Sequence, residues 1–118
     1  MKKRKLPRKV KKSTLKRKAD ILFSLLIRSR GSCEMCGKTQ NLQCAHVYSR
    51  SNLHLRYDPK NALCLCSGCH MFRWHKEPAD SILWFQGVYK DEWEYLVKEK
   101  NIIEHTIDYE KIIKLLKG

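Results

Sequence analysis

The 118-residue sequence predicts one small α+β domain in which two short strands and several helices surround a zinc site. Three observations predict this fold class. Two Cys-x-x-Cys pairs flank a short irregular segment, two apolar runs inside that segment have the length of strands, and apolar residues outside it recur at helical spacing. Because a hairpin and one helix bury little surface alone, a metal would contribute much of the stability of this segment.

The chain begins with a basic arm over residues 1–13, and a single domain is expected over residues 14–118. Residues 2–18 contain eleven Lys or Arg and no acid, whereas residues 19–118 contain fourteen basic and twelve acidic residues. The arm is too polar to fold alone, so we expect it to be disordered without a ligand. A basic arm on a nearly neutral domain predicts a polyanionic partner, nucleic acid first, although a solubilising tail is the alternative. The arm residues expected to contact nucleic acid are Lys2, Lys3, Arg4, Lys5, Arg8 and Lys9.

Apolar spacing predicts a helix from about residue 14 to residue 30, stopped by Gly31 and packed on the zinc segment. Residues 42–47 have the pattern of a short strand, and residues 62–65 that of a second strand or an extended turn. A further helix should begin near Ser67. Three more helical segments are expected after it, over residues 79–86, 90–100 and 107–117.

The chain contains no apolar run of 18 residues and no signal-peptide core, so an intracellular protein is expected. In a reducing compartment, Cys-x-x-Cys pairs favour a metal over disulfides, and zinc takes four such ligands in a tetrahedron. The four residues assigned to a structural Zn²⁺ are Cys33, Cys36, Cys66 and Cys69. Cys44 and Cys64 lie outside the pairs and are expected in the core, with Cys64 as a rival ligand because it lies two residues before Cys66.

His46 and Asn61 lie between the two Cys-x-x-Cys pairs, which we call the knuckles, and His70 follows the second knuckle directly. This order, together with both knuckles, resembles the HNH endonucleases, the ββα-metal or His-Me finger group. A closer resemblance is to the phage recombination proteins of the NinG type, carried by Cys-x-x-Cys-Gly-Lys, Leu-Gln-x-x-His-x-x-Ser-Arg and Leu-Arg-Tyr-Asp-x-x-Asn-Ala. The resemblance covers about residues 31–97 and implies a zinc-stapled ββα-metal unit with its core at about residues 31–76 and flanking helices.

The resemblance implies a metal-dependent DNA endonuclease. His46 would be the general base, Asn61 would orient the His46 loop, and His70 would bind a catalytic Mg²⁺ or Mn²⁺. Many HNH enzymes have a metal ligand immediately before the first histidine, where this chain has Ala45. His75 is the candidate second ligand, although its spacing of five residues from His70 places it off the same α-helical face.

Arg50 and Arg56 flank the loop between His46 and Asn61 and are candidates for phosphate contacts, with ordinary surface charge as the alternative. His54, in the same polar loop, is expected to be solvated or to contact phosphate. The expected partner is DNA, including branched recombination intermediates, and a phage-encoded protein would act in the bacterial host cytoplasm. The competing hypotheses are a non-catalytic zinc-knuckle DNA-binding protein and a protein directed at RNA.

Overall fold

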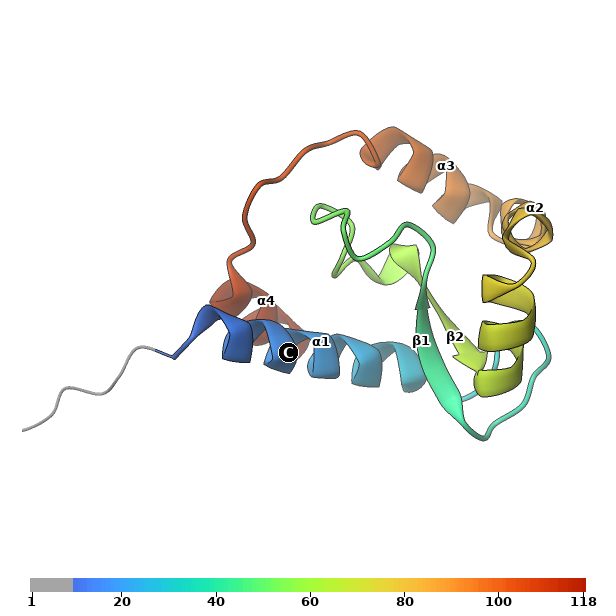
Figure 1. Cartoon of the computed structure of the whole chain (residues 1–118), viewed down its shortest axis with the longest axis horizontal. Coiled ribbons are helices and arrows are strands. Elements are labelled where there is room, and N and C mark those ends of the chain that lie inside the picture. Colours follow the sequence, from blue (N-terminus) through green and yellow to red (C-terminus); the bar gives the residue numbers. More distant parts are fainter. Residues whose placement is uncertain (1–9) are drawn as a thin grey trace, which may run out of the picture.

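The structure, a computed structural model, describes residues 10–118 and contains a two-stranded antiparallel sheet with helices on both faces (Figure 1). In chain order the elements are α1 (Lys12–Arg28), β1 (Leu42–His46), the 3-10 turn η1 (Pro59–Asn61), β2 (Ala62–Cys66), the π-helix η2 (Cys69–His75), α2 (Pro78–Val88), α3 (Lys90–Glu99) and α4 (Tyr109–Leu116). The expected small α+β fold is therefore confirmed, with strand and helix bounds within about two residues of those predicted.

The two faces of the hairpin contact two different groups of helices. On one face Cys64 packs against Phe23 and Ile27 of α1, while on the other Leu63 and Leu65 join the core that η2, α2 and α3 cover. Alternate side chains of a strand point to opposite faces, so a strand covered on both sides has no exposed residue. All five residues of β2 are buried for this reason.

Helix α1 lies along the hairpin and also along α4, as Figure 1 shows. Ala19, Phe23 and Ile27 are spaced four residues apart and are all buried, so they form one continuous apolar stripe on α1. Tyr109 and Ile113 of α4 complete the packing at Ala19. The helix therefore packs on the zinc segment as expected.

The ends of α1 follow from local chemistry. Gly31 has a φ of +89°, a left-handed conformation that favours glycine and terminates the helix as predicted. At the other end α1 begins at Lys12, so the last two residues of the expected arm are helical. The arm residues Lys2, Lys3, Arg4, Lys5, Arg8 and Lys9 lie outside the described residues. Among residues 10–118, no helix is long and apolar enough to cross a membrane.

Candidate metal centre and histidine groove

The four cysteines of the two knuckles come together at one end of the hairpin. Their sulfur atoms all lie within 4.8 Å of one another, and Cys36 Sγ lies 3.6 Å from Cys66 Sγ. A tetrahedral zinc with bonds of about 2.3 Å holds its sulfur ligands about 3.8 Å apart, so this cluster has the right size to bind one metal ion such as zinc. Cys33, Cys66 and Cys69 are buried and Cys36 is exposed.

Backbone N–H groups lower the pKa of Cys33 and Cys66 and favour their thiolates, whereas burial and the neighbouring thiols raise the pKa of Cys69. The Cys69 N–H donates to Cys66 Sγ over 3.4 Å. Burial tends to raise the pKa of Cys33, but backbone N–H groups of Cys66, Cys36 and Met35 outweigh it and lower the pKa to about 6. N–H donors that stabilise a thiolate favour the form of cysteine that binds a metal cation.

Cys64, the rival ligand, is not part of this cluster. It is fully buried opposite Cys44 in the hairpin and packs against Phe23 on the α1 face. Burial raises the pKa of both thiols, to about 11 for Cys44. Cys64 is therefore the small apolar core residue expected from the sequence, whereas Cys44 is half-buried and packs at the edge of the same cluster.

The imidazoles of His70 and His75 face each other on η2. Their Nε2 atoms are 2.9 Å apart and their ring centroids 4.5 Å apart. In an α-helix a spacing of five residues separates two side chains by about 140°, but the i→i+5 bonding of a π-helix brings them nearly into line. The expectation that His75 lies off the face of His70 assumed an α-helix, whereas this segment is a π-helix.

Gln43, on strand β1, determines which nitrogen of His70 is available. Its Oε1 accepts a hydrogen bond from His70 Nδ1 over 2.7 Å, which leaves the lone pair on Nε2, the atom that faces His75. Burial, with smaller contributions from His75 and His46, lowers the pKa of His70 and favours its neutral form. Two nitrogens bound to one ion lie about 3.0–3.4 Å apart, so this pair could supply two ligands to a metal.

His46, at the end of β1, is held by the backbone of residue 56. Its Nε2 lies 3.1 Å from the carbonyl oxygen of Arg56, and its ring packs against Phe23 with 5.5 Å between the centroids. A carbonyl oxygen can only accept, so the proton of neutral His46 is on Nε2 and the lone pair is on Nδ1. Burial is the main reason that the pKa of His46 is lowered, and it keeps the ring neutral at pH 7.

Asn61 is completely buried and clamps the chain that follows His46. Its Oδ1 accepts from the Tyr48 N–H over 2.7 Å, and its Nδ2 donates to the carbonyl oxygens of Tyr48 and Leu55 over 3.0 and 3.1 Å. Its own carbonyl accepts from the Val47 N–H over 2.9 Å. These are the side-chain contacts with the His46 loop that the sequence analysis expected of Asn61.

Arg56 does not have the exposed side chain that a phosphate contact requires. It is 6% exposed, and its guanidinium donates to the Asp20 carboxylate, to the Tyr57 hydroxyl and to the Arg50 carbonyl. The prediction of a phosphate contact is wrong for this residue, because its donors are used inside the protein. Arg50, by contrast, is exposed and its side chain remains a candidate for phosphate.

His54 likewise has partners inside the protein. Its Nδ1 lies 2.7 Å from Glu104 and its Nε2 lies 3.7 Å from Glu99, and the hydrogen bond to Glu104 is the main cause that raises its pKa. A histidine between two carboxylates is not placed to receive a phosphate, so that part of the prediction is wrong. Its contacts tie the loop before Asn61 to the end of α3 and to the segment that follows it.

The histidines share one open groove of about 580 Å³ between α1, β1 and η2. It is lined by residues from all three elements and from the loop after β1, among them Asp20, Cys44, His46, Arg50, His70 and His75. Ala45 is excluded from it, because its side chain is fully buried in the core on the other face of the sheet. The groove therefore combines the neutral imidazole of His46, the facing imidazoles of His70 and His75, and the exposed guanidinium of Arg50.

Two residues of this site were missed by the sequence analysis. Asp20 reaches the groove from α1, 26 positions before His46, and Gln43 orients His70 from the neighbouring strand. Gln43 had no usable signal, since it lies three positions before His46 and strand alternation assigns the two side chains to opposite faces. Asp20 had none, because a single acid in a basic helix is an ordinary surface residue.

A comparison of the chain with known proteins adds no assignment: no family model, no curated protein and no solved structure matches it.

Proposed function

We propose that this protein is a metal-dependent endonuclease that hydrolyses phosphodiester bonds of DNA, with His46 as its general base. The observation that carries the proposal is the groove in which His46, His70, His75 and Arg50 meet. The order of elements around it, β1, β2 and then the helical η2, is the order expected of a ββα-metal unit. Phosphodiester hydrolysis needs an activated water, charge stabilisation and a phosphate clamp, and each has a candidate here.

The state of His46 suits it to proton abstraction. Nδ1 carries the lone pair and Nε2 donates to the Arg56 carbonyl, so the ring can accept a proton from water while its orientation is held. The hydroxide formed attacks phosphorus, the bond to the 3′ oxygen breaks, and that oxygen takes up a proton. The products are a 5′ phosphate and a 3′ hydroxyl.

The imidazole pair on η2 fits a divalent metal. His70 offers Nε2 because Gln43 holds its Nδ1 proton, and His75 offers Nε2 at 2.9 Å from it. A bound divalent ion would supply charge neutralisation at the phosphate and the departing oxygen. Imidazole suits first-row transition metals better than Mg²⁺, so of the two ions expected from the sequence this donor set favours Mn²⁺.

The described part of α1 offers a path for the DNA backbone. One open face of this helix presents Lys16, Arg17 and Arg28, and it shares Asp20 and Ser24 with the histidine groove. The only acid in this stripe, Asp20, is neutralised by Arg56. A basic surface that leads into the groove would bind phosphates of any sequence.

The test is a plasmid-cleavage assay with each divalent ion in turn. The wild type should cut with Mn²⁺, and His46→Ala should bind DNA with unchanged affinity but lose activity by about 10²–10⁴-fold. The matched control is His105→Ala. His105 is exposed, so this substitution should leave cutting unchanged.

The competing hypothesis is a non-catalytic zinc-knuckle DNA-binding protein, favoured by the apolar Ala45 at a position where many HNH enzymes have a ligand. DNA binding without cleavage under any divalent ion would establish that alternative and refute the enzyme. Cleavage of RNA but not of DNA would change the substrate class and keep the chemistry.

A further inference from the structure

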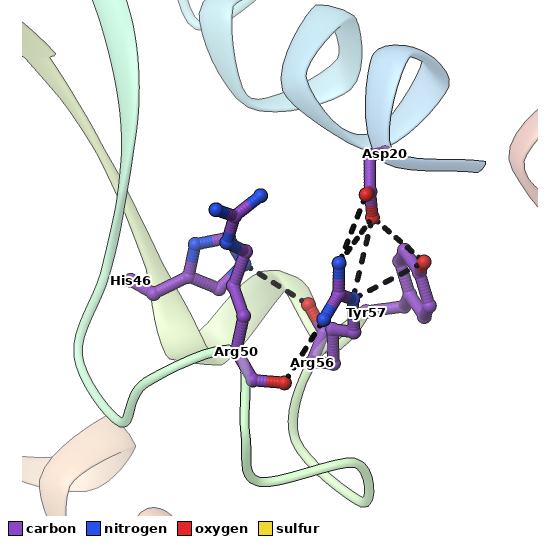
Figure 2. A network of polar contacts seen from close by, with 5 residues as sticks. All are labelled: Asp20, His46, Arg50, Arg56 and Tyr57. Atoms are coloured by element: carbon purple, nitrogen blue, oxygen red, sulfur yellow. Dashed lines mark hydrogen bonds and ion pairs between the residues drawn. The ribbon is translucent and has the colours of Figure 1, made fainter. Parts of the chain in front are cut away.

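A single buried guanidinium connects α1 to the loop after β1. Arg56 Nη2 donates to both oxygens of Asp20 over 2.9 and 3.1 Å, and Nε donates to Asp20 over 3.3 Å (Figure 2). The Tyr57 hydroxyl donates to the same carboxylate over 2.7 Å. The loop is thereby anchored to a helix 36 positions away in the sequence.

Arg56 also touches two groups of the proposed reaction. Its carbonyl oxygen accepts from His46 Nε2 over 3.1 Å, and its Nη1 donates to the carbonyl oxygen of Arg50 over 3.1 Å. Figure 2 shows the two contacts leaving the same residue in different directions. The position of residue 56 therefore determines both the tautomer of the base and the point from which the Arg50 side chain projects.

We infer that Arg56, held by Asp20, is a positioning residue that aligns His46 and Arg50 with each other for the reaction. This inference rests on the proposed function, which supplies the roles of those two residues. Helix α1 then contributes to the reaction through Asp20, in addition to presenting basic residues to DNA. Asp20 and Arg56 act through their neighbours and need no contact with DNA.

Arginine is needed here because of its shape. A guanidinium directs its N–H groups along several fixed directions in one plane, so it can hold a carboxylate on one edge and a carbonyl on another. Lysine keeps the positive charge but concentrates its donors at one atom. Arg56→Lys therefore separates positioning from charge, because the titratable and charged groups that face His46 (Asp20, Arg50, residue 56, His70 and His75) keep their number and kind.

The chain provides a matched control at Arg30. Its guanidinium also bridges a carboxylate, Glu34, and two backbone carbonyls, those of Pro59 and Ala62, but it lies outside the histidine groove. Arg30→Lys should therefore cost stability of a similar kind without altering His46.

The experiment uses the full chain loaded with zinc and measures two quantities for the wild type, Arg56→Lys and Arg30→Lys. Nitrogen-15 NMR of the histidine rings reports the tautomer of His46, and single-turnover cleavage at saturating DNA reports the chemical step. The wild type and Arg30→Lys should show the proton on Nε2 and equal rates. Arg56→Lys should show mixed tautomers and a rate lowered by at least about tenfold, since a displacement of about 1 Å can cost up to a hundredfold.

The outcomes separate this inference from the proposed function. If no variant cuts DNA, the proposed function fails, and the tautomer of His46 still decides whether Arg56 positions it. A folded Arg56→Lys protein with the wild-type tautomer and rate overturns the inference, as does a change in Arg30→Lys of equal size. Should Arg56→Lys fail to fold, Asp20→Asn, which keeps one acceptor for the guanidinium, replaces it. Because this variant also removes a charge that faces His46, the tautomer of His46 and not the rate is its deciding measurement: mixed tautomers support the inference and the wild-type tautomer overturns it.

Discussion

Replacing Asn61 with alanine tests whether one buried amide holds the loop that follows His46. The substitution removes the three side-chain hydrogen bonds of Asn61. The Leu55 carbonyl keeps a second donor, the Asp58 N–H, but the N–H and C=O of Tyr48 each lose the side-chain partner that they have. Each buried group left unsatisfied costs about 1–3 kcal/mol, so the free energy of unfolding should fall by about 3 kcal/mol.

That loss is large for a domain of this size. Total stabilities are about 5–15 kcal/mol, and the unfolding entropy of 118 residues is about 250 cal/mol/K, so the melting temperature should fall by about 12 °C. The measurement is urea unfolding with zinc and reductant held constant, followed by tryptophan fluorescence.

Asn52→Ala is the control for this experiment. The Asn52 side chain also binds two backbone groups, the Leu55 N–H and the Lys100 carbonyl, but it is partly exposed, so water can replace it and the cost should stay below about 1 kcal/mol. If Asn61→Ala costs no more than Asn52→Ala, the account of the clamp is refuted.

Four further predictions concern the metals, the base and the arm. Cys69→Ser should release the structural zinc and Cys64→Ser should retain it, as counted with a zinc-binding dye; release from both would place Cys64 in the site. Because burial lowers the pKa of His46, the base stays neutral to lower pH, so the acidic limb of kcat/KM should lie below pH 6.5, and a limb above that value would contradict the assignment. His75→Ala should raise the Mn²⁺ concentration needed for half-maximal cutting by about 10–100-fold, and an unchanged requirement would exclude it as a ligand. Deleting residues 2–9, which hold six basic residues, should reduce the salt slope of DNA binding by up to about 5 and leave cleavage at saturating DNA unchanged; an unaltered slope would mean that the arm does not touch the phosphates.

The cysteine cluster could be predicted from the sequence because its geometry is local. A Cys-x-x-Cys turn places two sulfurs on one side of a metal whatever the rest of the chain does, so only the meeting of the two turns depended on the fold. The same holds for the hairpin: a strand was expected over residues 42–47 and a strand or extended turn over residues 62–65, and the structure has strands at Leu42–His46 and Ala62–Cys66.

The errors came from residues whose partners are distant in the sequence. Arg56 belongs to a polar loop, and nothing near it indicates that Asp20, 36 positions earlier, neutralises it in the interior. His54 similarly meets Glu104, 50 positions later. A charged residue in a loop is usually exposed, and only tertiary packing shows when it is buried with a partner.

His75 was weighed with the wrong helical geometry. Periodicity analysis assumes 3.6 residues per turn, and it has no means of detecting a short π-helical segment, since that conformation depends on how the segment packs. The pairing of His70 with His75 therefore became visible only in three dimensions.

The π-helix η2 begins at Cys69, so the cysteine cluster that could bind a metal and the imidazole pair share one element. A π-helical turn is less stable than an α-helical one and persists only where its surroundings hold it. Loss of the knuckle metal would free the first residue of η2 and let the segment relax toward α-helical winding, which rotates His75 away from His70. Under the proposed function, a protein without metal at the cysteine cluster would then hold His70 and His75 too far apart to bind one ion together.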